Sequence, residues 1–288
     1  MPRLYEPFPP PRQLALAKAV TEKSTAFPAL AEQVVVARGL ALARLLPSMR
    51  KGPGPGRLPV YEGRSITVLG LHPERLRFWV DVSDGRALLL GGHLDQGQPL
   101  SCDGYQLAIR RIARAADSRC LTATVVPSSI LLDSLQGLWL PAATDTRVAS
   151  RALLSLGALL SSLVVDFLLR VRLHGSDIGA RHLVALPVPL LSAGDLRNEE
   201  LMGRAARLVC TSSSFARLAR DAGVPMGEEG DEAARGRLRA EIDGEVAHLY
   251  GLSEEEFQMV LSMYPLIPDP AKLAAHNAYR DIERGVRR

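Results

Sequence analysis

The sequence predicts an α+β fold with N-terminal helices, a β-rich subdomain, a long buried helix and a C-terminal helical bundle. Apolar residues recur at helical spacing up to residue 57, alternate with polar residues over 58–140, and return to helical spacing from 145 onward. The 288 residues are 47% hydrophobic and 23% charged, which excludes a wholly disordered chain. We therefore expect a helical N-terminal extension with a Gly/Pro linker (1–57), a β-rich subdomain (58–144) and a helical subdomain (145–288).

The N-terminal extension starts with a Pro-rich stretch, Met1–Arg12, and continues with a helix expected over Ala29–Leu46. Alternating Gly and Pro then occupy residues 52–56, and this alternation sustains neither a helix nor a strand. The segment lacks the G-x-x-x-x-G-K-[ST] spacing of a phosphate loop. It is therefore expected to be a linker.

The clearest strand signal of the β-rich subdomain covers residues 75–82. Leu76, Phe78, Val80 and Val82 alternate with the residues between them, so that Arg75, Arg77, Trp79 and Asp81 share the opposite face. Similar runs predict strands at Ser65–Leu71, Ala87–Leu90, Tyr105–Ile112 and Cys120–Val126. The subdomain is thus expected to hold at least five strands.

A single long helix is expected over Arg147–Arg172, and its uncharged part is Ala152–Val165. This run of 14 residues is shorter than the roughly 20 that a membrane span needs, so we favour a buried core helix. Asp166 is expected to pair with Arg151, Arg170 or a backbone donor. No membrane partner is predicted.

The remaining C-terminal elements are marked by prolines and caps. We expect an extended segment over His182–Pro189, helices over Glu199–Ala222 and Asp231–Tyr250, a capping box at Ser253–Glu256 that opens another helix, and a last helix over Lys272–Arg284.

Cysteine content and the N-terminal sequence bear on the compartment. Cys102, Cys120 and Cys210 are too few and too scattered for a disulfide framework or a structural zinc site. The Pro-rich start replaces the apolar run of a secretory signal. A cytoplasmic location is therefore expected.

The net charge of +4 is distributed unevenly along the chain. Residues 1–182 hold 22 Lys and Arg against 14 Asp and Glu, whereas residues 183–288 hold 13 against 17. A polyanionic partner is expected to meet the basic first part.

Catalytic and metal-binding motifs are missing from the sequence. It contains no G-x-S-x-G, H-E-x-x-H, paired C-x-x-C or G-x-G-x-x-G motif, and its six histidines never fall at metal-ligand spacing. We therefore predict no catalytic residue, no metal site and no cofactor site in this chain. Whether it is part of an enzyme stays open.

Four sequence segments, taken in their order along the chain, resemble a known family. They are Leu58–Ile66 with its Tyr-Glu-Gly-Arg, Arg110–Ala123 followed by Pro127, Leu154–Pro189 ending in Leu-Pro-Val-Pro, and Arg237–Phe257. Together they resemble the C-terminal target-recognition region of type II (subclass G) restriction–modification enzymes and of phage-exclusion adenine-specific DNA methylases, over roughly residues 58–265.

The resemblance implies a DNA sequence-recognition module whose partner is double-stranded DNA. In the family, S-adenosylmethionine and the Asn-Pro-Pro-Tyr/Phe motif belong to a methylase half, which here would be a separate methyltransferase domain or subunit. The chain departs from the family in the loop His174–Gly179, where paired glycines and an asparagine are usual.

The candidate DNA-binding residues are basic or polar side chains in predicted strand ends and loops. They are Arg64, Arg75, Arg77, Arg110, Arg111, Arg114, Arg172, His174, Ser176, Arg181 and His182.

Each group has an alternative interpretation. Arg110, Arg111 and Arg114 could be a solvated strand edge, and Arg64 could pair with Glu62 or Asp81. The face of Arg75, Arg77 and Trp79 could stack on an unpaired or flipped base, or be covered by a neighbouring helix.

Two other functions stay open. The chain could be a non-catalytic assembly or scaffold subunit that docks its acidic helical end onto a defence-system partner. It could also be an independent enzyme with an unrecognised site.

Overall fold

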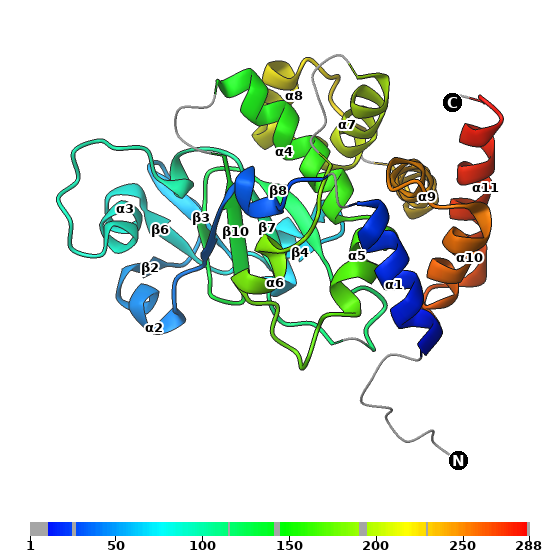
Figure 1. Ribbon diagram of the computed structural model, residues 1–288. Helices are drawn as coiled ribbons and strands as arrows, with labels where there is room; N and C mark the ends of the chain where they lie inside the picture. The colour runs from blue at the N-terminus through cyan, green and yellow to red at the C-terminus, as the bar shows by residue number, and fades with distance from the viewer. Residues whose placement is uncertain are drawn as a thin grey trace.

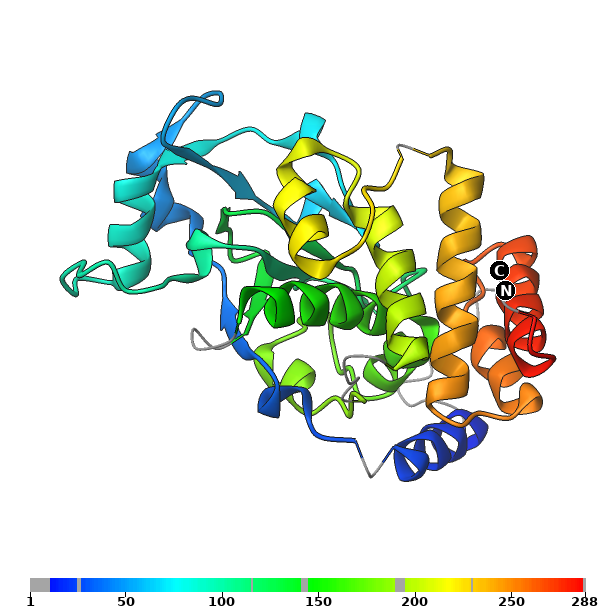
Figure 2. The ribbon, with the colours of Figure 1, turned by 90° about the horizontal axis from the view of Figure 1, so that it is seen from above.

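The structure is a computed structural model that describes residues 11–24, 27–114, 116–140, 145–189, 195–228 and 230–286. Helices and small sheets coexist, which confirms the α+β class. The sheets and the short helices α2 and α3 lie at one end, and α9, α10 and α11 lie at the other (Figures 1 and 2). The Pro-rich start lies outside the described residues as far as residue 10.

Two four-stranded sheets and a hairpin form the β part. The first sheet has the order β1 (Val35–Arg38), β10 (Leu135–Trp139), β7 (Gln106–Arg110), β8 (Ala123–Val126), and all its pairs are antiparallel. The second has the order β2 (Met49–Arg50), β6 (Trp79–Asp81), β3 (Arg57–Tyr61), β9 (Ile130–Leu131), and its β3–β9 pair is parallel. The hairpin joins β4 (Ile66–Thr67) to β5 (Gly70–Leu71).

The other regular elements of the described chain are helices. The α-helices are α1 (Pro11–Lys23), α2 (Leu42–Leu45), α3 (Val82–Leu90), α4 (Thr146–Leu160), α5 (Leu163–Arg170), α6 (Ala180–Val184), α7 (Leu196–Val209), α8 (Ala216–Ala222), α9 (Glu232–Leu249), α10 (Glu254–Ser262) and α11 (Asp269–Glu283). The 3-10 turns are Leu30–Glu32, Leu46–Ser48, Gly63–Ser65, Pro73–Arg75, Ser101–Asp103 and Ser213–Phe215.

The helix expected over Ala29–Leu46 is wrong. A 3-10 turn occupies Leu30–Glu32, β1 follows, and only Leu42–Leu45 is α-helical. The three consecutive valines from Val34 to Val36 favour a strand, because β-branched side chains pack well on a sheet. Through β1 and β2, residues 1–57 contribute a strand to each four-stranded sheet.

Two of the predicted strands also need correction. Residues 87–90 belong to α3, which ends at Gly91 with a left-handed φ of 62°. The strand expected over residues 75–82 is limited to Trp79–Asp81, because Pro73 opens a 3-10 turn that runs to Arg75. Strands over 105–112 and 120–126 are confirmed as β7 and β8, and residues 65–71 form the β4–β5 hairpin.

The long helix expected over Arg147–Arg172 is two helices, α4 and α5, that meet at 65°. Ser162 begins the second one by accepting a hydrogen bond from the backbone N–H of Val165, so the serine pair at 161–162 is the breaker. Residues 153–165 of this helix pair are buried, as the core-helix prediction required, whereas the first turn of α4 is exposed. Within the described ranges, no single helix has the length and apolarity of a membrane span, and only this bent pair passes that test jointly.

The C-terminal predictions are mostly confirmed. Asp231 caps α9, Ser253 and Glu256 form the expected capping box of α10, and α11 ends one residue before the predicted end. The helix over Glu199–Ala222 is interrupted after Val209, and the segment expected to be extended begins with α6.

The buried face of the first sheet meets α4. Along β7, Leu107 and Ile109 point into the helical core, whereas Ala108 packs on the opposite side against residues that include Tyr61. Gly157 of α4 lies so close to Leu107 that an added Cβ would be 3.4 Å from it. A helix thus covers one face of the sheet at short range.

Two buried carboxylates join this helical layer to the loop before β8. Asp166 accepts hydrogen bonds from the backbone N–H of Leu121 at 2.6 Å and the Tyr264 hydroxyl at 2.9 Å, and it pairs with Arg170. Asp243 accepts from the backbone N–H of Leu163 at 2.7 Å and pairs with Arg119 at 3.1 Å. The pairing of Asp166 with Arg170 and a backbone donor is as expected from the sequence.

Candidate nucleic-acid interface

The candidates Arg64, Arg75 and Arg77 gather around one carboxylate. Arg77 forks onto Glu62 with N–O distances of 3.0 and 3.1 Å, and Arg64 pairs with the same group at 3.1 Å. Arg75 reaches the backbone oxygen of Arg64 at 3.4 Å. The pairing alternative for Arg64 is thus confirmed, and the common strand face of Arg75 and Arg77 is wrong because residue 75 lies in a 3-10 turn.

Arg110 is half-buried at the end of β7 and anchors the hairpin. Its Nε donates to the carbonyl of Gly63 at 3.0 Å and its Nη2 to that of Ile66 at 2.8 Å. Burial lowers the pKa of the Arg110 guanidinium, the effect that desolvation has on any cation. This arginine is therefore not part of a solvated strand edge.

Arg111 and Arg114 lie near the loop that follows α5. Arg111 pairs with Asp177 at 2.8 Å and donates to the carbonyl of Asp133, while Ala113 N–H bonds to the carbonyl of Ser176. Arg114 is exposed. The structure therefore brings these two candidates together with Ser176, although they are about sixty residues apart in sequence.

The other candidates were expected in one loop, but Arg181 and His182 belong to helix α6, and the group divides into half-buried and exposed residues. Arg172 is half-buried and donates to the carbonyl of Leu168 and to the Thr21 hydroxyl, and burial lowers its pKa. His174, Ser176 and Arg181 are exposed. His182 accepts from the backbone N–H of Gly179 at 3.1 Å, and its pKa is lowered, first by burial and then by neighbouring Arg181.

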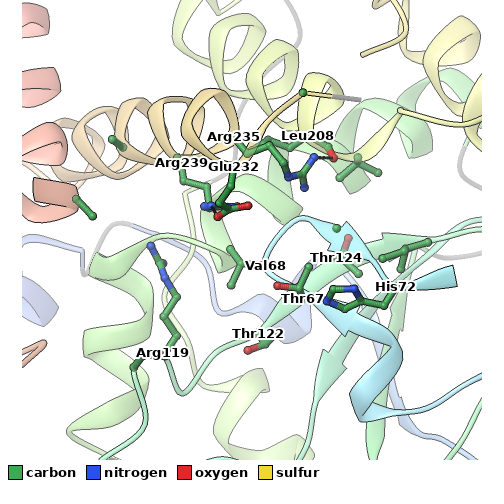
Figure 3. Close-up of a pocket in the computed structure, with 18 of the residues that line it drawn as sticks. Thr67, Val68, His72, Arg119, Thr122, Thr124, Leu208, Glu232, Arg235 and Arg239 are labelled. Carbon is green, nitrogen blue, oxygen red and sulfur yellow. Dashed lines mark hydrogen bonds and ion pairs between the residues drawn. The ribbon is translucent and has the colours of Figure 1, made fainter. Parts of the chain in front are cut away.

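A cleft of about 1240 Å³ separates the hairpin and the β8 edge from the C-terminal helices (Figure 3). Its walls come from the hairpin, the loop before β8, the end of α7, one face of α9 and the segment before α11. The charged residues that line it are Arg110, Arg119, Arg235, Arg239, Asp117, Glu232 and Asp243. Thr67, Thr122 and Thr124 also face it (Figure 3).

Three of the cleft arginines were not candidates from the sequence. Arg119 pairs with Asp243 and donates to the carbonyl of Ser161 at 2.5 Å. Arg239 pairs with Glu232. Arg235 is one helical turn from Arg239 on α9, so an i, i+4 pair of arginines was the available signal.

Arg235 ties the helical part to the hairpin. Its Nη1 donates to the carbonyl of Leu208 and its Nη2 to that of Leu69, both at 3.0 Å. Leu69 has a φ of 50°, the left-handed conformation that a side chain disfavours by about 1–2 kcal/mol. The hairpin turn is therefore held in a costly conformation by its buried leucine and this arginine.

Two of the four guanidinium groups lack a carboxylate partner among the described residues. Arg110 and Arg235 bond only to carbonyl oxygens, whereas Arg119 and Arg239 are paired with acids. Burial also lowers the pKa of Arg235. Arg110 and Arg235 are thus half-buried arginines of one cleft that form no ion pair among the described residues, although Asp117 and Glu232 of the same cleft interact with them electrostatically. Guanidinium groups bonded only to carbonyl oxygens make this cleft a candidate anion-binding surface.

A metal site is not formed by the described residues, since no group of three His, Cys, Asp or Glu side chains is placed to hold an ion. Cys102, Cys120 and Cys210 are buried, and burial raises the pKa of each thiol to about 12.

No protein-family model matches the chain, and no curated protein sequence matches it. Among solved structures, it is similar to a Type IIL restriction-modification enzyme, MmeI, in complex with DNA. The identity is 13% and the TM-score 0.44, over 86% of this chain. The match covers 35% of the MmeI chain, so this chain spans about a third of that enzyme's length.

Proposed function

We propose that the protein is the DNA sequence-recognition module of an adenine-specific DNA methyltransferase or restriction–modification system. Its partners would be double-stranded DNA and a methyltransferase domain or subunit, which would hold S-adenosylmethionine and carry out the transfer. The four sequence phrases over residues 58–265 support this assignment. The chain itself would carry no catalytic residue.

The observation that carries the proposal is the pair of cleft arginines, Arg110 and Arg235, whose hydrogen bonds go only to carbonyl oxygens. Arg110 and Arg235 are fixed by carbonyl groups from different elements, so little side-chain freedom is left to lose when an anion arrives. Phosphate oxygens would accept from their remaining N–H groups, and Thr67 offers a hydroxyl on the same wall. The cleft would thus hold the DNA backbone.

Sequence choice would be made by side chains that are exposed and not committed to an ion pair. His174 and Ser176 in the loop after α5, and Arg181 in the first turn of α6, meet this condition. Arg64, Arg77 and Arg111 are held by carboxylates, so they would contribute mainly to the shape of the surface. Arg172 would position the loop, because its guanidinium faces Leu168 and Thr21.

A salt titration of DNA affinity tests the proposal. The slope of log affinity against log salt changes by about 0.9 for each phosphate contact, so Arg110→Gln combined with Arg235→Gln should flatten it by up to about two. Arg38→Gln is the matched control, because Arg38 lies on the edge strand β1, pairs with Asp133 and does not line the cleft. Both proteins would be measured on specific and scrambled duplexes, with the methyltransferase partner present.

The two variants should separate affinity from discrimination. Replacing His174 and Arg181 by Ala should reduce the preference for the specific duplex and leave the scrambled one nearly unchanged. An unchanged slope in the double arginine variant would contradict the phosphate role of the cleft. DNA affinity that is absent with and without the partner would favour the assembly-subunit alternative.

A further inference from the structure

A second cavity, of about 700 Å³, lies beside the cleft and is lined by aromatic side chains. We call it the aromatic pocket; its rings are those of Tyr61, Trp79, Tyr105, Trp139 and Phe215. Trp79 comes from β6 and Trp139 from β10, so one tryptophan belongs to each four-stranded sheet. They are the two tryptophans of the chain, and both are half-buried.

The charges around the aromatic pocket are already compensated. Asp103 pairs with Arg86 at 2.7 Å, and Asp221 pairs with Arg217 at 3.4 Å. Among the described residues, the arginine that lines this cavity, Arg217, is ion-paired, unlike Arg110 and Arg235 in the cleft. Its ligand is therefore expected to present an uncharged surface here.

Hydroxyl groups are the polar groups still available in the aromatic pocket. Ser128, Ser150 and Ser212 line it, and their hydroxyls form no hydrogen bond with any other described residue. A hydroxyl can donate and accept, which suits the edge of a nucleobase, because such an edge presents both kinds of group. Aromatic faces beside such hydroxyls suit a flat, uncharged heterocycle.

The aromatic pocket and the cleft share a wall. Leu71, Pro73, Ser212 and Phe215 line both cavities. A nucleotide whose phosphate lay in the cleft would therefore have its base within reach of the pocket. The volume also lies within the roughly 300–1,000 Å³ that is usual for small-molecule sites.

We propose that the aromatic pocket binds an unpaired nucleobase of the DNA whose phosphates occupy the cleft. This rests on the proposed function. A base inside the duplex stack cannot enter the pocket, so the ligand is an extrahelical base, stacked against Trp79 or Trp139 and bonded at its edge by the serine hydroxyls.

Tryptophan fluorescence reports directly on the pocket, because both tryptophans line it. The full chain would be titrated with a duplex that carries one unpaired adenine and with the same duplex abasic at that nucleotide. The adenine duplex should quench the fluorescence and bind more tightly. Since base–aromatic stacking accounts for about 1–3 kcal/mol per base, Trp139→Ala should weaken that duplex roughly 5- to 150-fold and leave the abasic one unchanged.

A second variant covers the case in which Trp139→Ala fails to fold. Ala149→Phe places a ring into the pocket from α4 without removing a core side chain, and it should abolish the difference between the two duplexes. Val148→Phe is the matched control, because Val148 is 56% exposed on the same helix and does not line the pocket.

The outcomes separate this inference from the proposed function. Equal binding of both duplexes without quenching overturns the base site and leaves DNA binding intact. If neither duplex binds, the chain would be titrated with free deoxyadenosine. Tryptophan quenching that is lost in Ala149→Phe would support the base site without the proposed DNA binding, and the absence of quenching would overturn the base site. Stronger quenching by a proline-rich peptide than by deoxyadenosine also overturns it.

Discussion

The hydrogen bond between the Tyr264 hydroxyl and Asp166 should be worth more than an ordinary tyrosine hydrogen bond. Both residues are fully buried, and their oxygens are 2.9 Å apart. Tyr264→Phe keeps the ring, which lies 4.5 Å from the Arg170 guanidinium, and removes only the hydroxyl, which donates to Asp166 and also to the carbonyl of Leu163 at 2.7 Å. Asp166 keeps the Leu121 N–H and Arg170, so the charge stays compensated.

The magnitude follows from the charge of the acceptor. A hydrogen bond to a charged group contributes about 1.5–3 kcal/mol, whereas one between neutral groups contributes about 0.5–1.5 kcal/mol. Tyr264→Phe should therefore lower the folding equilibrium constant roughly 10- to 150-fold. Tyr250→Phe is the matched control, because the Tyr250 hydroxyl is similarly buried but donates to the neutral carbonyl of Pro187 at 2.6 Å.

Urea unfolding, followed by tryptophan fluorescence and circular dichroism, measures the stability of both variants. The slope of the unfolding free energy against urea concentration should be the same as in the parent protein. In an Asp166→Asn background, the cost of Tyr264→Phe should fall to that of Tyr250→Phe. Equal costs of the two tyrosine substitutions in the parent protein would refute the reasoning.

Three further predictions concern the core, pH dependence and the methyl donor. Leu160→Asp places a charge at a fully buried position of α4 and should cost several kcal/mol in urea unfolding; an unchanged midpoint would mean that the helix is exposed. Glu245 is 1% exposed, and its pKa in the folded protein is raised, first by burial and then by Glu200. The ionised carboxylate therefore lowers the free energy of unfolding, and this loss is complete once the pH has risen through the folded-state pKa. Glu245→Gln should therefore stabilise the protein at pH 7.5, and the gain should shrink as the pH falls to 4.5; a gain that grew on acidification would contradict this. Calorimetry on the isolated chain should detect no saturable binding of S-adenosylmethionine, and a saturable signal would favour an independent enzyme.

Much of the fold could be predicted because local signals agree with the tertiary structure. Asp231 and Ser253 are cap residues followed by helical periodicity, and α9 and α10 begin directly after them. The β7 and β8 strands were predicted from short runs similar to the alternating run over residues 75–82, and both are strands in the structure. The predictions failed where short elements compete, as in the valine run of β1 and the serine pair between α4 and α5.

The cleft was harder to predict because tertiary packing creates it. Arg119 and Arg235 are more than a hundred residues apart, and each is held by carbonyl groups that no sequence pattern marks. The predicted candidate Arg64 is held by Glu62, a pairing that the sequence offered, whereas Arg111 is held by Asp177, which only the folded chain brings within reach. Whether an arginine has N–H groups left to bind an anion therefore depends on the acids and carbonyl groups that the fold places beside it.

Strand β1 can pair with β10 only after the ribosome has synthesised β10. Val35–Arg38 are synthesised about a hundred residues before Trp139 completes their partner strand, an interval of roughly 5–20 s at ordinary ribosome speeds. The ion pair between Lys23 of α1 and Glu256 spans 233 residues, so this contact forms still later. Such a high contact order slows folding and leaves the valine strand exposed on the nascent chain. Association with chaperones, or with a partner synthesised nearby, would matter most during that interval.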